Sequence, residues 1–240
     1  MKQKTISVLQ LYPRDMNIYG DWGNVLTIVR RLEWHGYTPE LLTYNQGDAF
    51  PEHVDLVLGG GGQDAGQSKI QDDLLKIGPK LHELAEADVP MLVICGLYQL
   101  FGKFFKTSTG EIIKGIELLD LETYAGSERL IGNIVTQSDD FGDIVGYENH
   151  SGQTFLADGV KAFGTVVRGA GNSGKDATEG ARYKNVIGSY LHGSLLPKNP
   201  QVADWLITQA VRRKYGDFEP NVINDTFALK ARGIAASRPR

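Results

Sequence analysis

A continuous apolar run limits the fold of this chain more than any other segment. Val89-Pro90-Met91-Leu92-Val93-Ile94 has no polar side chain at either set of alternating positions. A strand that is apolar on both faces must be covered on both, as in the middle of a parallel sheet. Because parallel strands are joined by long crossover connections, usually helices, the run predicts an α/β fold.

The segments around this run alternate between strand-like and helix-like patterns. Strands are expected at 6–12, 40–44 and 55–58, and the third runs into four consecutive glycines. Apolar spacing predicts helices from about 25 to Gly36 and from about 67 to 87, with Gly78-Pro79 marking a break or a second start in the latter. This alternation predicts a doubly wound, mostly parallel sheet with helices on both faces.

The second half of the chain has a different pattern. Short strand candidates at 130–136, 144–147 and 163–168 are separated by Gly, Asn and Asp, so we expect antiparallel or mixed additions to the same sheet. A last helix is expected over about 201–215, and 230–240 is expected to be a frayed tail. The predicted organisation is one domain over 1–220, followed by a partly disordered C-terminal extension over 221–240.

Charge and cysteine content exclude several classes of protein. With 25 Lys and Arg against 29 Asp and Glu, the formal net charge is -4, which gives no sign of a basic nucleic-acid surface. No stretch reaches the roughly 18 apolar residues of a membrane helix, and the start lacks the apolar segment of a signal peptide. The single cysteine, Cys95, excludes an intramolecular disulfide and a cysteine-based zinc cluster, and no metal site is expected. We expect a cytoplasmic protein that neither spans a membrane nor binds nucleic acid.

Two glycine-rich motifs have the spacing of nucleotide-binding loops but lack a required feature. The segment 169–174 matches G-x-G-x-x-G, yet the residues after it are polar and broken by glycine where a helix is required. We therefore expect a surface turn there. The segment 61–68 has Walker A spacing, but Gln67 stands where the phosphate-binding lysine is needed. Neither motif predicts a nucleotide site.

Cys95 is a stronger candidate, because it follows the apolar strand directly and is itself followed by Gly96. Ligands bind at the carboxyl ends of strands in an open α/β sheet. A tight turn from strand to helix would expose the sulfur there, and backbone N–H groups would favour a thiolate and bind an oxyanion. Taken alone, however, a buried cysteine that packs as a small hydrophobe is the simpler interpretation.

Histidine favours the catalytic interpretation of Cys95. His192 follows a strand-like run in Gly188-Ser189-Tyr190-Leu191-His192-Gly193-Ser194, a placement that suits a base at another strand end. His150, in Tyr147-Glu148-Asn149-His150, is the competing candidate. A Cys–His pair needs only spatial proximity, so separation along the chain is no objection.

Together these residues resemble class I glutamine amidotransferases of the cobyric-acid-synthase branch. Three motifs carry the resemblance, in this order: Leu58-Gly59-Gly60-Gly61-Gly62-Gln63-Asp64, Ile94-Cys95-Gly96-Leu97-Tyr98-Gln99 and Tyr190-Leu191-His192-Gly193. Three further runs strengthen it: Tyr147-Glu148-Asn149-His150, Arg129-Leu130-Ile131-Gly132 and Leu195-Leu196-Pro197-Lys198-Asn199. The resemblance covers 8 to about 220, and within the branch it is closest to separate glutaminase subunits that serve lipid II amidation.

The resemblance implies a class I amidotransferase fold and a set of residue roles. Cys95 would attack the side-chain amide of glutamine and form a thioester, with His192 as the base. The backbone N–H groups of Gly96 and of one residue in Gly60-Gly61 would hold the oxyanion. Arg129 and Gln99 are the candidates for binding glutamine, although a solvated charge at a strand end remains an alternative for Arg129.

The resemblance also implies a partner. A MurT-type Mur ligase would use the ammonia to amidate the α-carboxyl of D-glutamate in lipid II, and this chain would meet the lipid II acceptor only through that ligase. ATP and Mg²⁺ would bind to the ligase, so no cofactor is expected in this chain. Two alternatives stay open: an amidotransferase for cobyrinate-type amidation, and a non-catalytic binding module in which Cys95 is structural.

The sequence departs from the wider class at two positions. Leu97 stands where the elbow usually has a second glycine, and Ser194 stands where a His-x-Glu motif would place a carboxylate. The third member of a triad orients the histidine and stabilises its charged form. Because no carboxylate lies at this spacing, we expect either a Cys95–His192 dyad or an acid supplied by the ligase partner.

Overall fold

The computed structural model describes residues 4–239 and contains two sheets. The first has the strand order β11-β12-β4-β3-β1-β2, in which all neighbouring pairs are parallel except β11 with β12. Its strands are β1 (Thr5–Leu11), β2 (Thr38–Tyr44), β3 (Leu56–Gly59), β4 (Met91–Ile94), β11 (Ala181–Tyr183) and β12 (Val186–Ser189). Strands β3, β4 and β12 are buried along their whole length, as the apolar run at 89–94 predicts for the centre of a parallel sheet.

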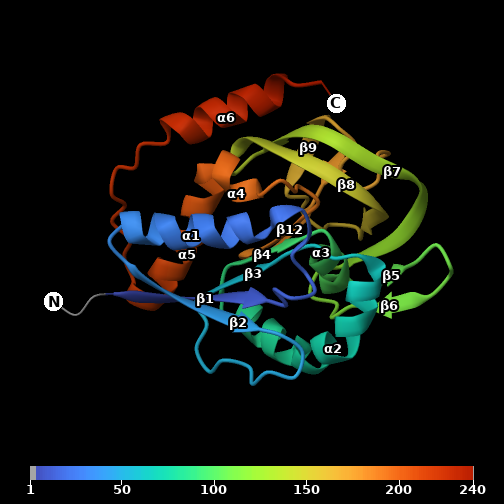
Figure 1. Ribbon diagram of the computed structural model, residues 1–240, viewed down its shortest axis with the longest axis horizontal. Coiled ribbons are helices and arrows are strands. Elements are labelled where there is room, and N and C mark those ends of the chain that lie inside the picture. The colour runs from blue at the N-terminus through green and yellow to red at the C-terminus, as the bar shows by residue number, and fades with distance from the viewer. Residues whose placement is uncertain (1–3, 240) are drawn as a thin grey trace.

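Helices cover both faces of this sheet, which confirms the predicted α/β architecture. Figure 1 shows α1 (Trp22–Trp34) on one side of the strands and α2 (Asp64–Glu86) on the other. Helix α5 (Pro200–Tyr215) packs beside α1, and the short helices α3 (Gly96–Phe101) and α4 (Leu195–Lys198) lie near the strand ends.

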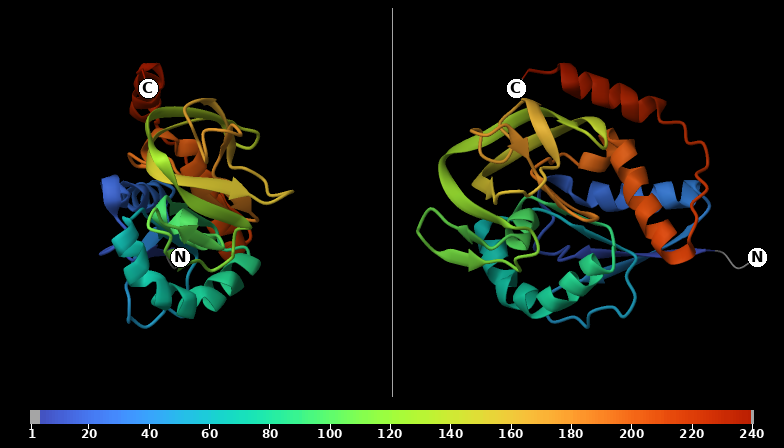
Figure 2. Two further views of the ribbon diagram at one scale, coloured as in Figure 1. Left: turned by 90° about the vertical axis from the view of Figure 1, so that its right-hand side faces the viewer. Right: turned by 180° about the vertical axis from the view of Figure 1, so that it is seen from behind.

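The expected break at Gly78-Pro79 is wrong, because α2 continues through it. Pro79 lies inside the helix, and Figure 2 shows that α2 curves along its length. A proline removes one backbone hydrogen bond and bends a helix, and here burial of the helix face outweighs that cost. Gly78 is itself buried, and a Cβ at this position would lie 3.0 Å from Ile116 Cγ2.

Most of the second half of the chain forms a separate sheet, including the three expected strands at 130–136, 144–147 and 163–168, whereas β11 and β12 join the first. The second sheet has the order β10-β9-β7-β5-β6, with β8 paired to β7. The strands are β5 (Phe104–Lys106), β6 (Ile112–Lys114), β7 (Leu121–Ser138), β8 (Gly142–Leu156), β9 (Gly164–Arg168) and β10 (Thr178–Glu179). The long β7–β8 hairpin is antiparallel, and it arches over the strand ends of the first sheet (Figures 1 and 2).

The expected surface turn at 169–174 is also wrong, because this segment encloses a buried carboxylate. Ala170 and Gly171 donate their backbone N–H groups to Glu148 of β8, at N···O distances of 2.9 and 2.8 Å. Gly169 and Gly171 have positive φ angles, so the glycine pattern serves this turn. The G-x-G-x-x-G spacing therefore builds an anion cradle that is filled from within the chain.

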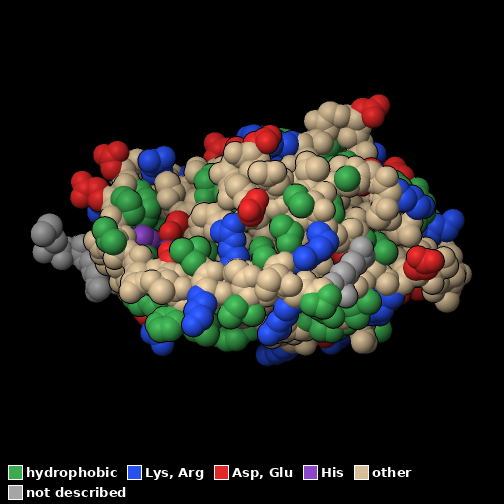
Figure 3. All heavy atoms as spheres, turned by 90° about the horizontal axis from the view of Figure 1, so that it is seen from above, with side chains coloured by type: hydrophobic (Ala, Val, Ile, Leu, Met, Phe, Trp, Pro, Cys, Tyr) green, Lys and Arg blue, Asp and Glu red, His purple; other side chains and the backbone are tan. Residues whose placement is uncertain are grey.

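Residues 226–237 are helical, which corrects the expectation of a frayed tail at 230–240 over the part of it up to 237, and position 240 lies outside the described residues. Helix α6 (Thr226–Ser237) has no buried residue and lies along the surface in Figure 1. Its attachment is polar: Arg31 of α1 binds Asp225, just before the helix, at 2.6 Å. Figure 3, which looks down on this side, shows basic and hydrophobic side chains interspersed. No helix within residues 4–239 is long and apolar enough to cross a membrane.

A second buried carboxylate, Glu179, lies beneath the ends of β4 and β12. It is fully buried and accepts hydrogen bonds from Ser189 Oγ at 2.7 Å and from the Tyr190 backbone N–H at 2.9 Å. Burial raises the pKa of Glu179 to about 8, and the nearby charge of Glu148 adds to the rise. The carboxyl is therefore protonated at neutral pH.

We predict that Glu179 makes the stability of the protein depend on pH. The folded pKa of Glu179 is about 8, above the usual value of 4.5. Its contribution to the free energy of unfolding is therefore fully present below pH 4.5 and is lost as the pH rises through 8. Glu179→Gln keeps the shape of the protonated side chain and removes the titration. Urea unfolding across this pH range should show the wild type losing stability relative to the variant, and parallel curves would contradict the assignment.

Candidate active site

Four neighbouring parallel strands end at one edge of the first sheet and bring the candidate residues together. Asp21 follows β1 through the short helix η1 (Ile18–Gly20), and Gly60–Gly62 follow β3. Cys95 follows β4, and His192 lies shortly after β12. Because the strands are parallel and adjacent, their carboxyl ends form one site, as is usual in open α/β sheets.

Cys95 forms the sharp turn between β4 and α3. Its φ of 50° and ψ of -102° are unfavourable for a residue with a side chain, and its backbone N–H holds the turn by donating to Ser189 O at 2.8 Å. The next position must be glycine, because a Cβ at Gly96 would lie 2.9 Å from Gly62 N. Leu97 is fully buried and packs against Gly59, so the elbow forms with leucine in place of a second glycine.

His192 lies beside Cys95 and is fixed by the second sheet. Its backbone N–H donates to Tyr147 O of β8 at 2.7 Å, and its carbonyl accepts from Tyr147 N at 3.3 Å. A Cβ added to Gly61 would lie 2.8 Å from His192 Cε1 and 3.1 Å from Cys95 Cβ, so the Gly61 backbone contacts both residues. The Tyr19 ring covers the imidazole edge-on, with centroids 5.0 Å apart.

A carboxylate of this chain lies beside His192. The expectation of a dyad, or of an acid supplied by the ligase partner, is therefore wrong. His192 Nδ1 lies 3.2 Å from Asp21 Oδ1, which places the Nδ1–H toward the carboxylate and leaves Nε2 to act on Cys95. The other carboxylate oxygen accepts from Gly61 N at 2.6 Å. Spacing from His192 could not find Asp21, which precedes it by 171 residues. The only signal was its position after the first strand.

The charges around His192 keep its imidazole protonated. Burial alone would lower its pKa, but the electrostatic interaction with Cys95 and the hydrogen bond to Asp21 outweigh burial and raise the pKa to about 10. His192 is fully buried and Asp21 is 4% exposed, so water screens this interaction little. The arrangement favours the protonated imidazole of His192 at neutral pH.

The expected oxyanion donors need one correction. Gly61 N donates to Asp21, and Gly60 packs against Met16 and Asp21 away from the pocket, so neither is placed as a donor to a ligand. Gly62 lines the pocket beside Cys95, and its N–H lies next to the Gly96 backbone. Gly62 is therefore the candidate donor from this loop, and Gly96 stays the second candidate, as the resemblance implies. Four consecutive glycines gave no indication of which one would face the cysteine.

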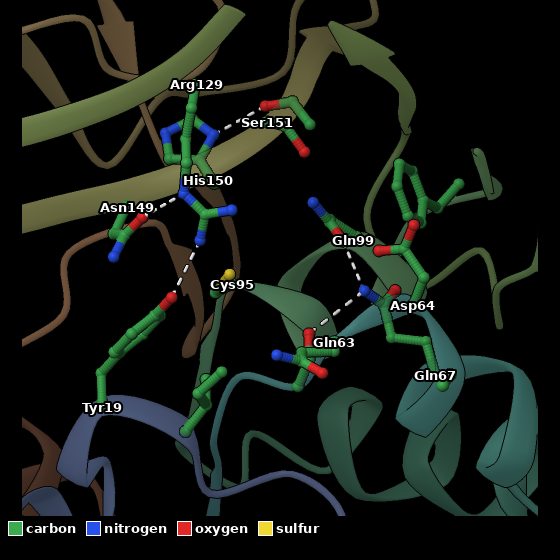
Figure 4. Close-up of a pocket in the computed structure, with 15 residues that line it drawn as sticks. Tyr19, Gln63, Asp64, Gln67, Cys95, Gln99, Arg129, Asn149, His150 and Ser151 are labelled. Carbon is green, nitrogen blue, oxygen red and sulfur yellow. Dashed lines mark hydrogen bonds between the residues drawn. The ribbon is translucent and has the colours of Figure 1, made fainter. Parts of the chain in front are cut away.

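A pocket of about 370 Å³ opens above Cys95, between α2 and the β7–β8 hairpin. Arg129 lies at its rim, where the guanidinium donates to Asn149 Oδ1 at 2.6 Å and to Tyr19 Oη at 2.8 Å (Figure 4). Gln99 lies at the base, where its Nε2 donates to Tyr190 Oη and its Oε1 accepts from Gln67 Nε2, both at 3.0 Å. Both predicted binding residues thus line the pocket, and sequence analysis missed Tyr19 and Gln67.

His150 also lines this pocket but is held in a different way. Its ring stacks on Tyr190 with centroids 3.6 Å apart, and its Nδ1 lies 2.6 Å from Gly152 O. Burial lowers the pKa of His150 to about 4, so the ring is neutral. Within residues 4–239, no group of three or more His, Cys, Asp or Glu side chains is arranged to hold a metal ion.

We predict that Asp21→Asn lowers the pKa of His192, because it removes the negative charge that faces Nδ1. NMR titration of the His192 ring in the full chain measures this directly. Asp15→Asn is a matched control, since Asp15 binds Lys69 rather than His192. An unchanged midpoint in Asp21→Asn would exclude Asp21 as the electrostatic partner.

Comparison with known proteins places this geometry in a family. Residues 7–200 match the CobB/CobQ-like glutamine amidotransferase domain. The chain is 37% identical over 224 residues to the lipid II isoglutaminyl synthase subunit GatD of Staphylococcus aureus, covering 93% of this chain and 91% of that protein. It is 38% identical to the GatD subunit of Streptococcus pneumoniae, covering 88% and 82% of the two chains.

Among solved structures, PurLQS from Thermotoga maritima is similar in fold, with a TM-score of 0.58 at 16% identity, covering 85% of this chain and 97% of that one. The strand-end cysteine and histidine, the pocket above them and the match over most of the chain lead to one conclusion. The chain belongs to the CobB/CobQ-like glutamine amidotransferase family.

Proposed function

We propose that this chain hydrolyses glutamine to glutamate and ammonia and supplies the ammonia to a ligase subunit that amidates lipid II. The observation that carries the proposal is Cys95 in a pocket large enough for an amino acid, with His192 beside it and Asp21 facing His192 Nδ1. The names of the two GatD relatives, each the glutamine-hydrolysing subunit of lipid II isoglutaminyl synthase, support the choice of acceptor.

The first half of the reaction forms a thioester. The Cys95 thiolate attacks the side-chain carboxamide carbon of glutamine, and the carbonyl electrons move onto oxygen. The N–H groups of Gly62 and Gly96 stabilise this oxyanion, and removing one such donor typically costs about 10²–10³ in kcat. As the tetrahedral intermediate collapses, the His192 imidazolium gives its proton to the nitrogen, and ammonia leaves.

The second half restores the enzyme. His192, now neutral, removes a proton from water, whose oxygen attacks the thioester carbon. A second oxyanion forms at the same site, and its collapse breaks the C–S bond and releases the Cys95 thiolate and the γ-carboxylic acid, which loses its proton to solvent to become glutamate. The proton taken from water remains on His192, so the starting ion pair is regenerated. Asp21 holds one imidazole tautomer through both halves.

The partner that we propose is a MurT-type Mur ligase. It would bind ATP and Mg²⁺, activate the α-carboxyl of D-glutamate in the stem peptide of lipid II, and use the ammonia to form D-isoglutamine. The two GatD relatives support this, since each is named as a subunit. We propose the cytoplasm as the compartment, where ATP is available and Cys95 stays reduced.

We predict that Cys95→Ala abolishes glutaminase activity in the complex with the ligase, because no other thiol can form the thioester. His192→Ala should be comparably inactive, since nucleophile and base act as one unit and their losses are not additive. Glutamate release measures both effects, and circular dichroism and co-purification with the ligase show that fold and assembly persist. Turnover by Cys95→Ala at the wild-type rate would end the assignment.

His150→Ala should reduce activity much less than His192→Ala. His150 is stacked on Tyr190 and its low pKa keeps it neutral, so it supplies no proton to the leaving nitrogen. Steady-state glutaminase kinetics of the two variants provide the comparison. If the two phenotypes are reversed, His150 is the base.

A further inference from the structure

Ser194, at the position where the sequence departs from the wider class, joins the segment of the proposed base to the segment of its acid. Its hydroxyl Oγ donates to the backbone carbonyl of Gly20 at 2.7 Å. Gly20 directly precedes Asp21, the carboxylate that faces His192 Nδ1. The Ser194–Gly20 hydrogen bond therefore lies next to the acid along one segment and shortly after the base along the other.

This contact requires a glycine in the first turn of α1. A Cβ at Gly23 would lie 2.1 Å from Ser194 Oγ and 2.8 Å from Ser194 Cβ, so a larger residue there would displace the serine. The next residue along α1 adds a second connection, because Asn24 Oδ1 accepts the backbone N–H of Leu196 at 2.9 Å. The start of α1 and the loop after the proposed base are thus held closely against each other.

The loop that carries Ser194 has an unfavourable backbone conformation. The φ of Ser194 is 46°, in the left-handed region that a residue with a side chain rarely adopts, and Gly193 before it has a φ of 70°. Such a conformation persists only where the surrounding contacts fix it. Lys198 provides two of them, since its Nζ donates to Gly193 O at 2.5 Å and to Ser194 O at 3.1 Å. In this conformation the hydroxyl of Ser194 reaches Gly20.

The contact between Asp21 and His192 is sensitive to how these two segments are held. Its length of 3.2 Å is at the upper end of the range for an N–H···O hydrogen bond, and about half an ångström more would break it. Neither residue belongs to a strand, because Asp21 follows η1 and His192 follows β12. A contact between two loops keeps its length only if the loops themselves are fixed to each other.

We propose that Ser194 is a positioning residue, whose hydroxyl keeps Asp21 within hydrogen-bond distance of His192 by holding Gly20. This inference rests on the proposed function, in which Asp21 holds one tautomer of the base. It gives the serine a specific role: it holds in place an acid that comes from another segment of the chain. Ser194 does not line the pocket above the cysteine, so it acts through Asp21 rather than on substrate.

A double-mutant cycle in the complex with the ligase separates this role from general support of the fold. Ser194→Ala should lower kcat about tenfold, the effect of one hydrogen bond, and leave KM unchanged. In an Asp21→Asn background the same substitution should change kcat by less than about twofold, because the acid that it positions is already gone. NMR titration of His192 should follow the same pattern, with a lowered pKa in Ser194→Ala and no further shift in the double variant. Cys95 and His150, which also interact electrostatically with His192, are the same in all four chains.

Two further variants complete the experiment. Ser194→Gly removes the same hydroxyl while favouring the positive φ, so it should repeat the loss even if Ser194→Ala folds poorly. Ser237→Ala is the matched control and should change neither readout, because it removes a serine hydroxyl that donates to a backbone carbonyl on α6, Ile234 O at 2.9 Å, outside the pocket.

Two results would overturn the inference: an equal loss of kcat in both backgrounds, which would make Ser194 merely structural, or an unshifted pKa of His192 in Ser194→Ala. The proposed function has its own point of failure, which is a wild-type complex that releases no glutamate from glutamine. The titration needs no turnover, so it decides the effect of Ser194 on the base in either case.

Discussion

The Asp21 carboxylate holds the candidate active site together. One oxygen accepts the Gly61 backbone N–H at the end of β3, and the other lies beside His192 Nδ1 after β12. Asp21 itself follows β1, so a single buried side chain connects three strand ends and fixes the tautomer of the proposed base. A buried carboxylate is stable only when it is paired or hydrogen-bonded, and here the same contacts that satisfy it also align the reaction.

The loop after β3 requires glycines, because its backbone lies so close to neighbouring residues that there is no room for side chains. A Cβ at Gly61 would lie 2.8 Å from the imidazole of His192, and one at Gly62 would lie 2.4 Å from Met16 Sδ. Close approach of the backbone brings N–H donors to the cysteine at no cost in side-chain entropy. In the turn between β4 and α3, the positive φ of Cys95 likewise allows the backbone to approach this loop closely.

Sequence patterns predicted the features that depend on a single segment of the chain. They failed for features that depend on contacts between distant segments. The apolar strand at 89–94, the elbow at Cys95 and the strand end at His192 were readable because each is a local signal. Asp21 was not, because its role depends on the order of strands in the sheet. The long β7–β8 hairpin was also missed as a separate sheet, since alternation along a strand does not say which sheet it joins. Helix α6 lacks an apolar stripe and is held mainly by polar contacts, so periodicity gave no sign of it.

The paired backbone hydrogen bonds between Tyr147 and His192 join the two sheets at the proposed base itself. The thiol belongs to the first sheet, whereas Arg129 and His150, at the rim and wall of the pocket, belong to the second. The hairpin that forms a wall of the pocket and the backbone of the proposed base are consequently parts of one hydrogen-bonded unit. A shift of the hairpin would therefore also displace the backbone of His192, since the Tyr147–His192 hydrogen bonds join the two.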